Sequence, residues 1–99
     1  MEFEWDEDKN RANFIKHGVR FETAVAVFDD AAELSEPALS VNGETRTQTM
    51  GFVAGVAVLF VVHTDRTSAE GGPVVRLISA RRASRKERAR YDRQDTENR

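Results

Sequence analysis

The sequence contains no cysteine and only two prolines among its 99 residues. Without cysteine, the chain offers no disulfide framework, no thiolate nucleophile and no cysteine-ligated metal. Its longest strongly apolar run, Val56–Val62, is far shorter than the roughly 20 residues that a membrane-spanning helix requires. The first residues also lack the basic and apolar regions of a secretory signal peptide. These absences predict a cytoplasmic protein with a single domain and one modest core.

The net charge of −2 conceals an uneven distribution of charge along the chain. Residues 1–44 contain 4 Lys/Arg and 11 Asp/Glu, whereas residues 45–99 contain 11 Lys/Arg and 6 Asp/Glu. Seven of the basic residues fall between Arg81 and Arg93. Such an asymmetry indicates a side of the protein that faces a polyanion, although ordinary solvated faces give the same composition.

Hydrophobic periodicity predicts an α+β domain in the order β-α-α-β-β-β-β-α, with an antiparallel sheet whose helices pack on one face. The expected helices lie at 7–17, at 20–28 and after Ser84, and the expected strands at 3–5, 32–36, 45–53, 56–64 and 74–81. The continuous apolar strand 56–64 is of the kind that is buried on both faces. We expect residues 1–93 to form the single domain and residues 94–99 to form a polar, frayed tail.

Two of the expected helices carry local signals at their ends. Asp6 is suited to cap the first helix, and Gly18 is suited to the left-handed position that ends it. Ser84 and Glu87 form the pattern of a capping box, in which each side chain bonds to the backbone N–H of the other residue. The last helix is therefore expected to begin directly after Ser84.

Four segments together resemble the BrnT family of type II toxin–antitoxin toxins. They read FEWDEDKNRANFIKHGVRFETAVAVFDD, ETRTQTMG, VVHTDR and RLISARRASRKERARY, and with their spacing they cover Glu2 to Arg93. The resemblance implies a RelE-like fold, ribosome-independent or ribosome-associated cleavage of RNA, and neutralisation by a cognate BrnA-like antitoxin. It also implies a toxin–antitoxin hetero-oligomer that contacts operator DNA only through the antitoxin. We expect the cleavage to need no cofactor.

Cleavage of RNA without a metal requires a base for the ribose 2′-OH, cations for the phosphoryl oxygens and an acid for the leaving oxygen. Arginine suits the second task because its planar fork binds phosphate oxygens and remains charged. Arg46, Arg76 and Arg81 occur on strand segments rather than on an exposed helix. We rank Arg81 and Arg46 as catalytic candidates and Arg76 as an RNA-binding candidate. Regular alternation puts Arg76 and Arg81 on opposite faces, unless the strand bulges near Ser79.

Four further residues are candidates for proton transfer or base stacking, and each has a structural alternative. His17 lies at a helix C-terminus, where the charged form is favoured, and a helix-end cation packed beside Trp5 is the other reading. His63 ends the buried strand, and a hydrogen-bonded structural histidine is the other reading. Glu87 is a candidate base, although the capping box already accounts for it. Tyr91 is a candidate for stacking on a base or donating a proton, and packing against the sheet is the other reading.

The remaining cations are expected to position the RNA backbone rather than to read its sequence. Lys9, Asn13 and Lys16 recur along one stripe of the first helix, where a solvated face is the ordinary reading. In the last helix the candidates are Arg85, Lys86 and Arg88, and Arg82, Arg90 and Arg93 add to the same charge. No compact carboxylate cluster accompanies the basic strand, which predicts that no metal is used.

Two classes of function remain open from the sequence. The first is an endoribonuclease toxin that cleaves mRNA and inhibits translation and growth. The second is a non-catalytic module that binds nucleic acid or the antitoxin, as a corepressor or a degenerate toxin does. The acidic half, with Asp29, Asp30 and Glu33, is expected either to repel RNA or to receive a basic segment of the antitoxin.

Overall fold

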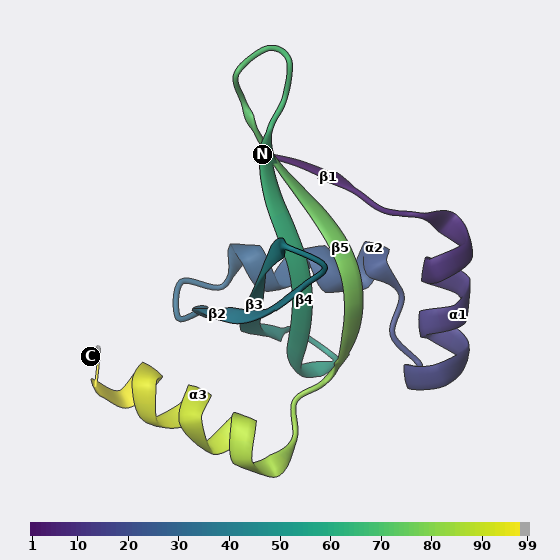
Figure 1. Cartoon of the computed structure of the whole chain (residues 1–99). Helices are drawn as coiled ribbons and strands as arrows, with labels where there is room; N and C mark the ends of the chain where they lie inside the picture. Colours follow the sequence, from purple (N-terminus) through teal and green to yellow (C-terminus); the bar gives the residue numbers. More distant parts are fainter. Residues whose placement is uncertain (98–99) are drawn as a thin grey trace.

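The structure is a computed structural model that describes residues 1–97, and it contains one five-stranded sheet with helices around it (Figure 1). The elements in chain order are β1 (Glu2–Glu4), α1 (Glu7–His17), α2 (Phe21–Ala24), the 3-10 helix η1 (Val25–Asp29), β2 (Leu34–Val41), β3 (Glu44–Val53), β4 (Ala57–Thr67), β5 (Pro73–Arg82) and α3 (Arg85–Glu97). The strand order is β1-β5-β4-β3-β2. Strands β2 to β5 form an antiparallel meander, and β1 pairs with β5 in parallel. The α+β class is confirmed.

Helix α1 begins and ends at the predicted residues. The Asp6 carboxylate accepts hydrogen bonds from the backbone N–H groups of Asp8, at 2.8 Å, and Lys9, at 3.2 Å. Gly18 has a φ of 72°, and its N–H donates to the carbonyl oxygen of Phe14 at 2.7 Å. These contacts satisfy orphan groups at both ends of the helix.

The second predicted helix, at 20–28, is divided into α2 and the tighter helix η1. Helix η1 lies very close to β3, because Gly51 faces Val27 there. A Cβ atom on Gly51 would lie 2.6 Å from the Val27 carbonyl oxygen. The absence of a side chain at Gly51 therefore lets the helix approach the sheet closely.

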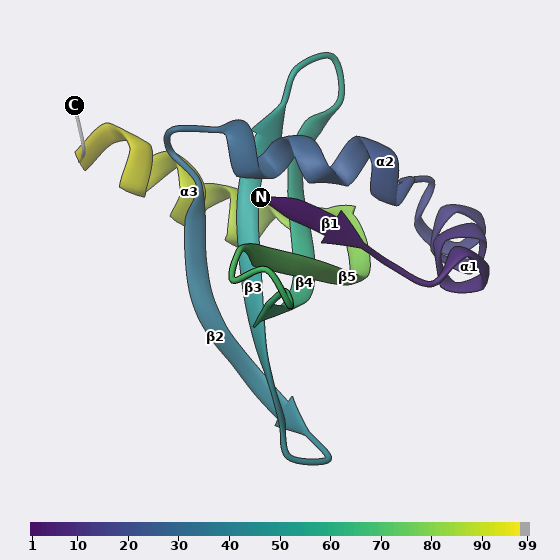
Figure 2. The same ribbon diagram turned by 90° about the horizontal axis from the view of Figure 1, so that it is seen from above.

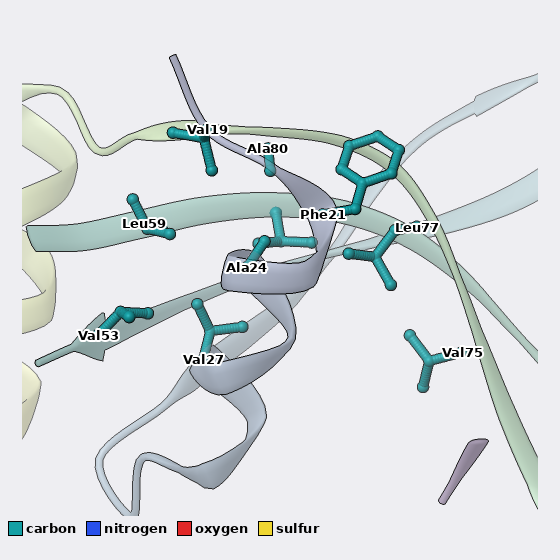
Figure 3. Close-up of a cluster of buried hydrophobic side chains, with 10 residues drawn as sticks. Val19, Phe21, Ala24, Val27, Val53, Leu59, Val75, Leu77 and Ala80 are labelled. Atoms are coloured by element: carbon teal, nitrogen blue, oxygen red, sulfur yellow. The ribbon is translucent and has the colours of Figure 1, made fainter. Parts of the chain in front are cut away.

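The main core lies between α2/η1 and one face of the sheet. Figure 3 shows side chains of α2 and η1 lying over those of the central strands. Its buried members are Val19, Phe21, Ala24, Val27, Val53, Leu59, Val61, Val75, Leu77 and Ala80. The strand members alternate along β4, as expected for residues that share one face of a pleated strand.

A second hydrophobic cluster lies on the opposite face of the sheet, so the prediction that the helices pack on one face is wrong. Met50, Val58 and Phe60 of the sheet are buried there with Tyr91 of α3. Strand β4 explains this arrangement, because its successive residues from Val58 to Val61 are all buried. A strand that is apolar on both faces needs cover on both faces, and α3 supplies part of the second cover.

Strand β2 begins later and runs much further than the prediction of 32–36. It continues through Pro37 to Val41, where Asn42 and Gly43, both with positive φ, connect it to β3. Pro37 is tolerated because β2 is the edge strand of the sheet, where one side of the backbone has no partner strand. The Asn-Gly pair is a strong hairpin signal that the sequence-based prediction overlooked.

Helix α1 lies beside the β5 edge of the sheet, as Figure 2 shows. The amide of Asn13 donates to the carbonyl oxygen of Ala80 at 2.8 Å and accepts from its N–H at 3.1 Å. The Asn13 side chain thus supplies hydrogen-bond partners to the backbone of Ala80, which lies beyond the part of β5 that pairs with β1.

Helix α3 includes Gln94 to Glu97, and the rest of the expected tail lies outside the described residues. No helix within residues 1–97 is long and apolar enough to cross a membrane.

Candidate functional site

A bulge in β5 brings Arg76 and Arg81 to the same face of the sheet. Val62 of β4 pairs with Ser79 and the next residue, His63, pairs with Leu77, so Ile78 has no partner. Leu77 and Ala80 consequently both face the main core. The arginines at 76 and 81 alternate with these core residues and therefore point to the opposite face.

Arg46 projects from the same sheet face. It lies four residues before Met50, which belongs to the second cluster, and side chains two and four residues apart share a face. Its side chain is 28% exposed, and its Nε lies 3.7 Å from a carboxylate oxygen of Glu44. The Nε atom is buried and makes no hydrogen bond to the described residues.

Arg66 is a fourth strand arginine on this face, and the sequence analysis did not identify it. Its Nε and one terminal nitrogen donate to the two carboxylate oxygens of Glu4, at 2.9 and 2.8 Å. Arg76 lies 3.7 Å from the same carboxylate. Hydrogen bonds from Arg66 lower the pKa of Glu4, and the same bonds raise the pKa of Arg66. We call the sheet surface that carries Arg46, Arg66, Arg76 and Arg81 the arginine face.

A signal for Arg66 was present in the sequence. It follows Val62 by four residues, and a β4 strand prolonged by three residues beyond Thr64 places both on one face. The predicted strand ends at Thr64, so Arg66 lies outside it and is not among the predicted site residues.

Arg81 is held in place from two directions. Its two terminal nitrogens donate to the two carboxylate oxygens of Glu87 at 2.8 and 2.9 Å, and one of them also donates to the Arg82 carbonyl oxygen at 3.1 Å. Its guanidinium carbon lies 4.2 Å from the centre of the Phe60 ring. This stacked, bidentate arrangement fixes the plane of the guanidinium at the edge of α3.

The Glu87 carboxylate binds both the Arg81 guanidinium and the Ser84 backbone N–H. The predicted capping box is confirmed. Its carboxylate accepts from the backbone N–H of Ser84 at 2.8 Å, while the Ser84 hydroxyl accepts from the N–H of Glu87 at 3.2 Å. Hydrogen bonding from Arg81, aided by the Ser84 contacts, lowers the pKa of Glu87 to about 2 despite partial burial. A carboxylate with this pKa is a weak base, and its geometry is that of a residue that positions Arg81.

Tyr91 faces the sheet rather than the solvent. Its ring is buried with Met50 and Phe60, and its hydroxyl donates a hydrogen bond to the carboxylate of Asp30. Burial raises the pKa of Asp30, but hydrogen bonds from the Phe52 N–H, the Tyr91 hydroxyl and the Ala32 N–H outweigh it and lower the pKa. Tyr91 therefore attaches α3 to the sheet, and its buried ring is not available as a platform for a base.

The two histidines lie away from the arginine face. His63 is buried on the opposite face, where its ring lies nearly perpendicular to that of Phe28 at a centroid distance of 5.1 Å. One ring nitrogen is 2.8 Å from the Thr49 hydroxyl and the other is 2.7 Å from the Asp65 carboxylate. His17 is the last residue of α1, and no contact with a strand arginine is found for it among the described residues. The histidines and the strand arginines are thus not brought together.

The cations of the two outer helices differ in how they are paired. Lys9 and Lys16 are exposed on α1, whereas Asn13, expected on the same polar stripe, is buried. On α3, Arg85 and Lys86 are exposed, Arg88 pairs with Asp92 at 3.1 Å, and Arg90 pairs with Glu36 of β2. Helix α3 therefore extends the positive charge beside Arg81. Among residues 1–97 no group of three His, Asp or Glu side chains is arranged to hold a metal ion.

The fold and this face define a small α+β protein with a cationic sheet surface bordered by a basic helix. Comparisons with known proteins give the class of this protein. The family model for BrnT, the ribonuclease toxin of type II toxin–antitoxin systems, matches residues 5–87. The chain therefore belongs to the BrnT family of ribonuclease toxins, as its sequence motifs predicted.

A solved structure supports the fold. The crystal structure of the Brucella abortus ribonuclease toxin BrnT matches with a TM-score of 0.61 and 24% sequence identity. The match covers 86% of this chain and 99% of the Brucella chain. None of the curated proteins matches this chain. Membership in a type II toxin family implies an RNA substrate and an antitoxin partner.

Proposed function

We propose that this chain is an endoribonuclease that cleaves mRNA on its arginine face by metal-independent attack of the ribose 2′-OH. The observation that carries the proposal is the convergence of four arginines from three strands on one sheet face, opposite the helices of the main core. Ordinary sheet alternation would separate Arg76 from Arg81, and the bulge at Ile78 unites them. A strand surface built in this way fits an extended polyanion.

Arg81 and Arg46 are the residues that would stabilise charge on the scissile phosphate. Arg81 is pre-oriented by Glu87 and Phe60, so little reorganisation is required when phosphate charge develops. Arg46 is 28% exposed on the same face, and its ion pair with Glu44 is long, at 3.7 Å. Arg76 and Arg66, which share Glu4, would hold the RNA backbone alongside. The exposed cations of α3, Arg85, Lys86 and Arg88, would add affinity that depends on salt.

Proton transfer by His63 or His17 receives no support from the geometry, because neither lies on the arginine face. The low pKa of Glu87 and its bond to Arg81 likewise favour positioning over proton abstraction. The proposed catalysis therefore rests mainly on electrostatic stabilisation by arginines. The 2′-oxygen bonds to phosphorus as the bond from phosphorus to the 5′-oxygen breaks, which leaves a 2′,3′-cyclic phosphate, and solvent water takes the 2′-OH proton and supplies one to the leaving 5′-oxygen. Loss of one preorganised donor of this kind typically costs about 10²- to 10³-fold in rate.

In the cell, cleavage of mRNA would inhibit translation and growth, and a BrnA-like antitoxin would neutralise the toxin in a hetero-oligomer. Operator DNA would be contacted through the antitoxin. A cytoplasmic location follows from an mRNA substrate.

The test is inducible expression and RNA cleavage in vitro, with wild type compared with Arg81→Ala, Arg46→Ala and Arg81→Lys. We expect growth arrest and cleavage that persists in EDTA, a loss of about 100-fold or more for Arg81→Ala, and partial activity for Arg81→Lys. Glu70→Gln, in the exposed β4–β5 loop, is the control and should cleave at the wild-type rate. Cleavage abolished by EDTA would refute the metal-independent mechanism. RNA binding without cleavage would instead indicate the non-catalytic module.

A further inference from the structure

Helix α1 has an inverted arrangement of polar and apolar side chains. Its buried residues are two asparagines, Asn10 and Asn13. Its large apolar residues face outward, with Phe14 39% and Ile15 84% exposed. A helix that packs on a sheet normally does the opposite, burying an apolar stripe and exposing its polar face.

The buried asparagines are explained by backbone groups that would otherwise lack partners. Asn10 accepts from the N–H of Phe21 at 2.8 Å and donates to Glu22 at 2.7 Å. Asn13 donates to the carbonyl oxygens of Val19, at 2.9 Å, and Ala80. These bonds attach α1 to the following segment and to the edge of β5. The hydrogen bonds that hold α1 in the fold therefore come from its asparagines and not from Phe14 or Ile15.

The outward residues form a small surface feature with two arginines, which we call the α1 patch: Arg11, Phe14, Ile15 and Arg20. These four residues line a shallow pocket of about 260 Å³. The guanidinium carbon of Arg20 lies 4.0 Å from the centre of the Phe14 ring. Arg11 forms an ion pair with the exposed Asp8. The patch is thus apolar at its centre and has two arginines at its borders.

The α1 patch is separate from the arginine face. Helix α1 lies beside the β5 edge of the sheet, while α3 lies at the far side, as Figures 1 and 2 show. Of the α1 residues, Asn13 makes a hydrogen bond to β5, and it comes from the buried side of the helix. A partner on the patch would therefore contact the toxin at a second surface.

We infer that the α1 patch binds an acidic amphipathic segment of the antitoxin, an inference that rests on membership in the type II toxin family. Arg11 and Arg20 complement acidic side chains, and Ile15 complements an apolar one. Exposed apolar groups with charged borders are typical of protein interaction sites. A standard interface buries about 1,600 Å², so the patch supplies one contact region within a larger interface.

Two other occupants fit the patch less well. RNA would gain little from Ile15, its most exposed residue, because an aliphatic side chain offers no face on which a base can stack. A second copy of this chain in a two-fold dimer would place the same patch on both subunits. Arg11 and Arg20 would then meet the same cations of the partner, which is unfavourable.

The experiment measures affinity between the purified toxin variants and the purified protein encoded directly downstream of the toxin gene. The variants are Ile15→Asp and Arg20→Glu. Val56→Asp is the matched control, because Val56 is an exposed apolar residue in the β3–β4 turn, away from α1. We expect Ile15→Asp to weaken binding by about 30-fold or more, the effect of a hot-spot residue, and Arg20→Glu to weaken it by about tenfold. Val56→Asp should bind within about twofold of wild type.

Each variant is also assayed for RNA cleavage and for self-association without the antitoxin. Unchanged cleavage by Ile15→Asp together with lost binding supports the inference, even if the arginine mechanism fails its own test. Antitoxin binding by Ile15→Asp within about twofold of wild type would overturn the inference. Loss of cleavage alone would identify an RNA surface, and loss of self-association alone would identify a toxin–toxin interface. Failure of the wild type to bind the downstream protein would also overturn it.

Discussion

Replacing Glu87 with glutamine tests whether the contact between Arg81 and the capping box contributes to stability through its charge. The substitution keeps the shape of the side chain and a carbonyl oxygen for the Ser84 N–H, but it removes the negative charge opposite Arg81. The ordinary pKa of 4.5 falls to about 2 in the folded protein. A difference of this size corresponds to about 3 kcal/mol.

The expected loss is smaller than that limit, because the Arg81 side chain is 37% exposed and solvent screens the pair. We therefore expect Glu87→Gln to lower the free energy of unfolding by about 1–2 kcal/mol at pH 7. A lowered pKa in the folded state stabilises the protein above the ordinary pKa. That contribution is lost as the pH falls from about 4.5 through about 2. The difference between wild type and variant should fall to less than half its neutral value at pH 3.

Urea denaturation of both proteins at pH 7, 5, 4 and 3 measures this difference. Glu70→Gln is the control for removal of an exposed carboxylate, and it should follow the wild type within about 0.5 kcal/mol at every pH. Arginine stays charged throughout this range, so only the carboxylate titrates. A difference for Glu87→Gln that stays constant from pH 7 to pH 3 would refute the reasoning.

Three further predictions concern the core, the helix attachment and the arginine face. Gly51→Ala should lower the free energy of unfolding by at least about 2 kcal/mol, because the new methyl group meets the Val27 backbone; equal stability in thermal melts would contradict this contact. Asn13→Ala should cost at least about 2 kcal/mol in urea denaturation by leaving the Ala80 backbone groups unpaired, and a loss below about 0.5 kcal/mol would show that water replaces the amide. Arg76→Gln should reduce the slope of log K for RNA binding against log salt by about one, whereas an unchanged slope would place Arg76 outside the RNA contact.

The features that were predictable from the sequence are those that depend on neighbouring residues. Asp6 and Gly18 bound α1, and Ser84 begins α3, because each cap is formed within a few residues of the helix end. The alternation that marks β3 and the continuous apolar run that marks β4 are equally local. The α+β class and the order of the elements follow from these signals.

The features that escaped prediction depend on residues far apart in the chain. The bulge at Ile78 is set by pairing with β4, and without it the relative faces of Arg76 and Arg81 could not be decided. Asn13 is buried because Ala80, 67 positions later, needs a partner for its backbone. His63 was expected at a strand end, but β4 continues to Thr67 and leaves the histidine inside the sheet.

The parallel pairing of β1 with β5 has a consequence for the order in which the protein can assemble. Glu2 to Glu4 align with Val74 to Arg76, so the first strand gains its partner only after Val74 to Arg76 have been synthesised. Until then Glu4 has neither Arg66 nor Arg76 beside it. The arginine face is therefore complete only when β5 has paired with both β4 and β1.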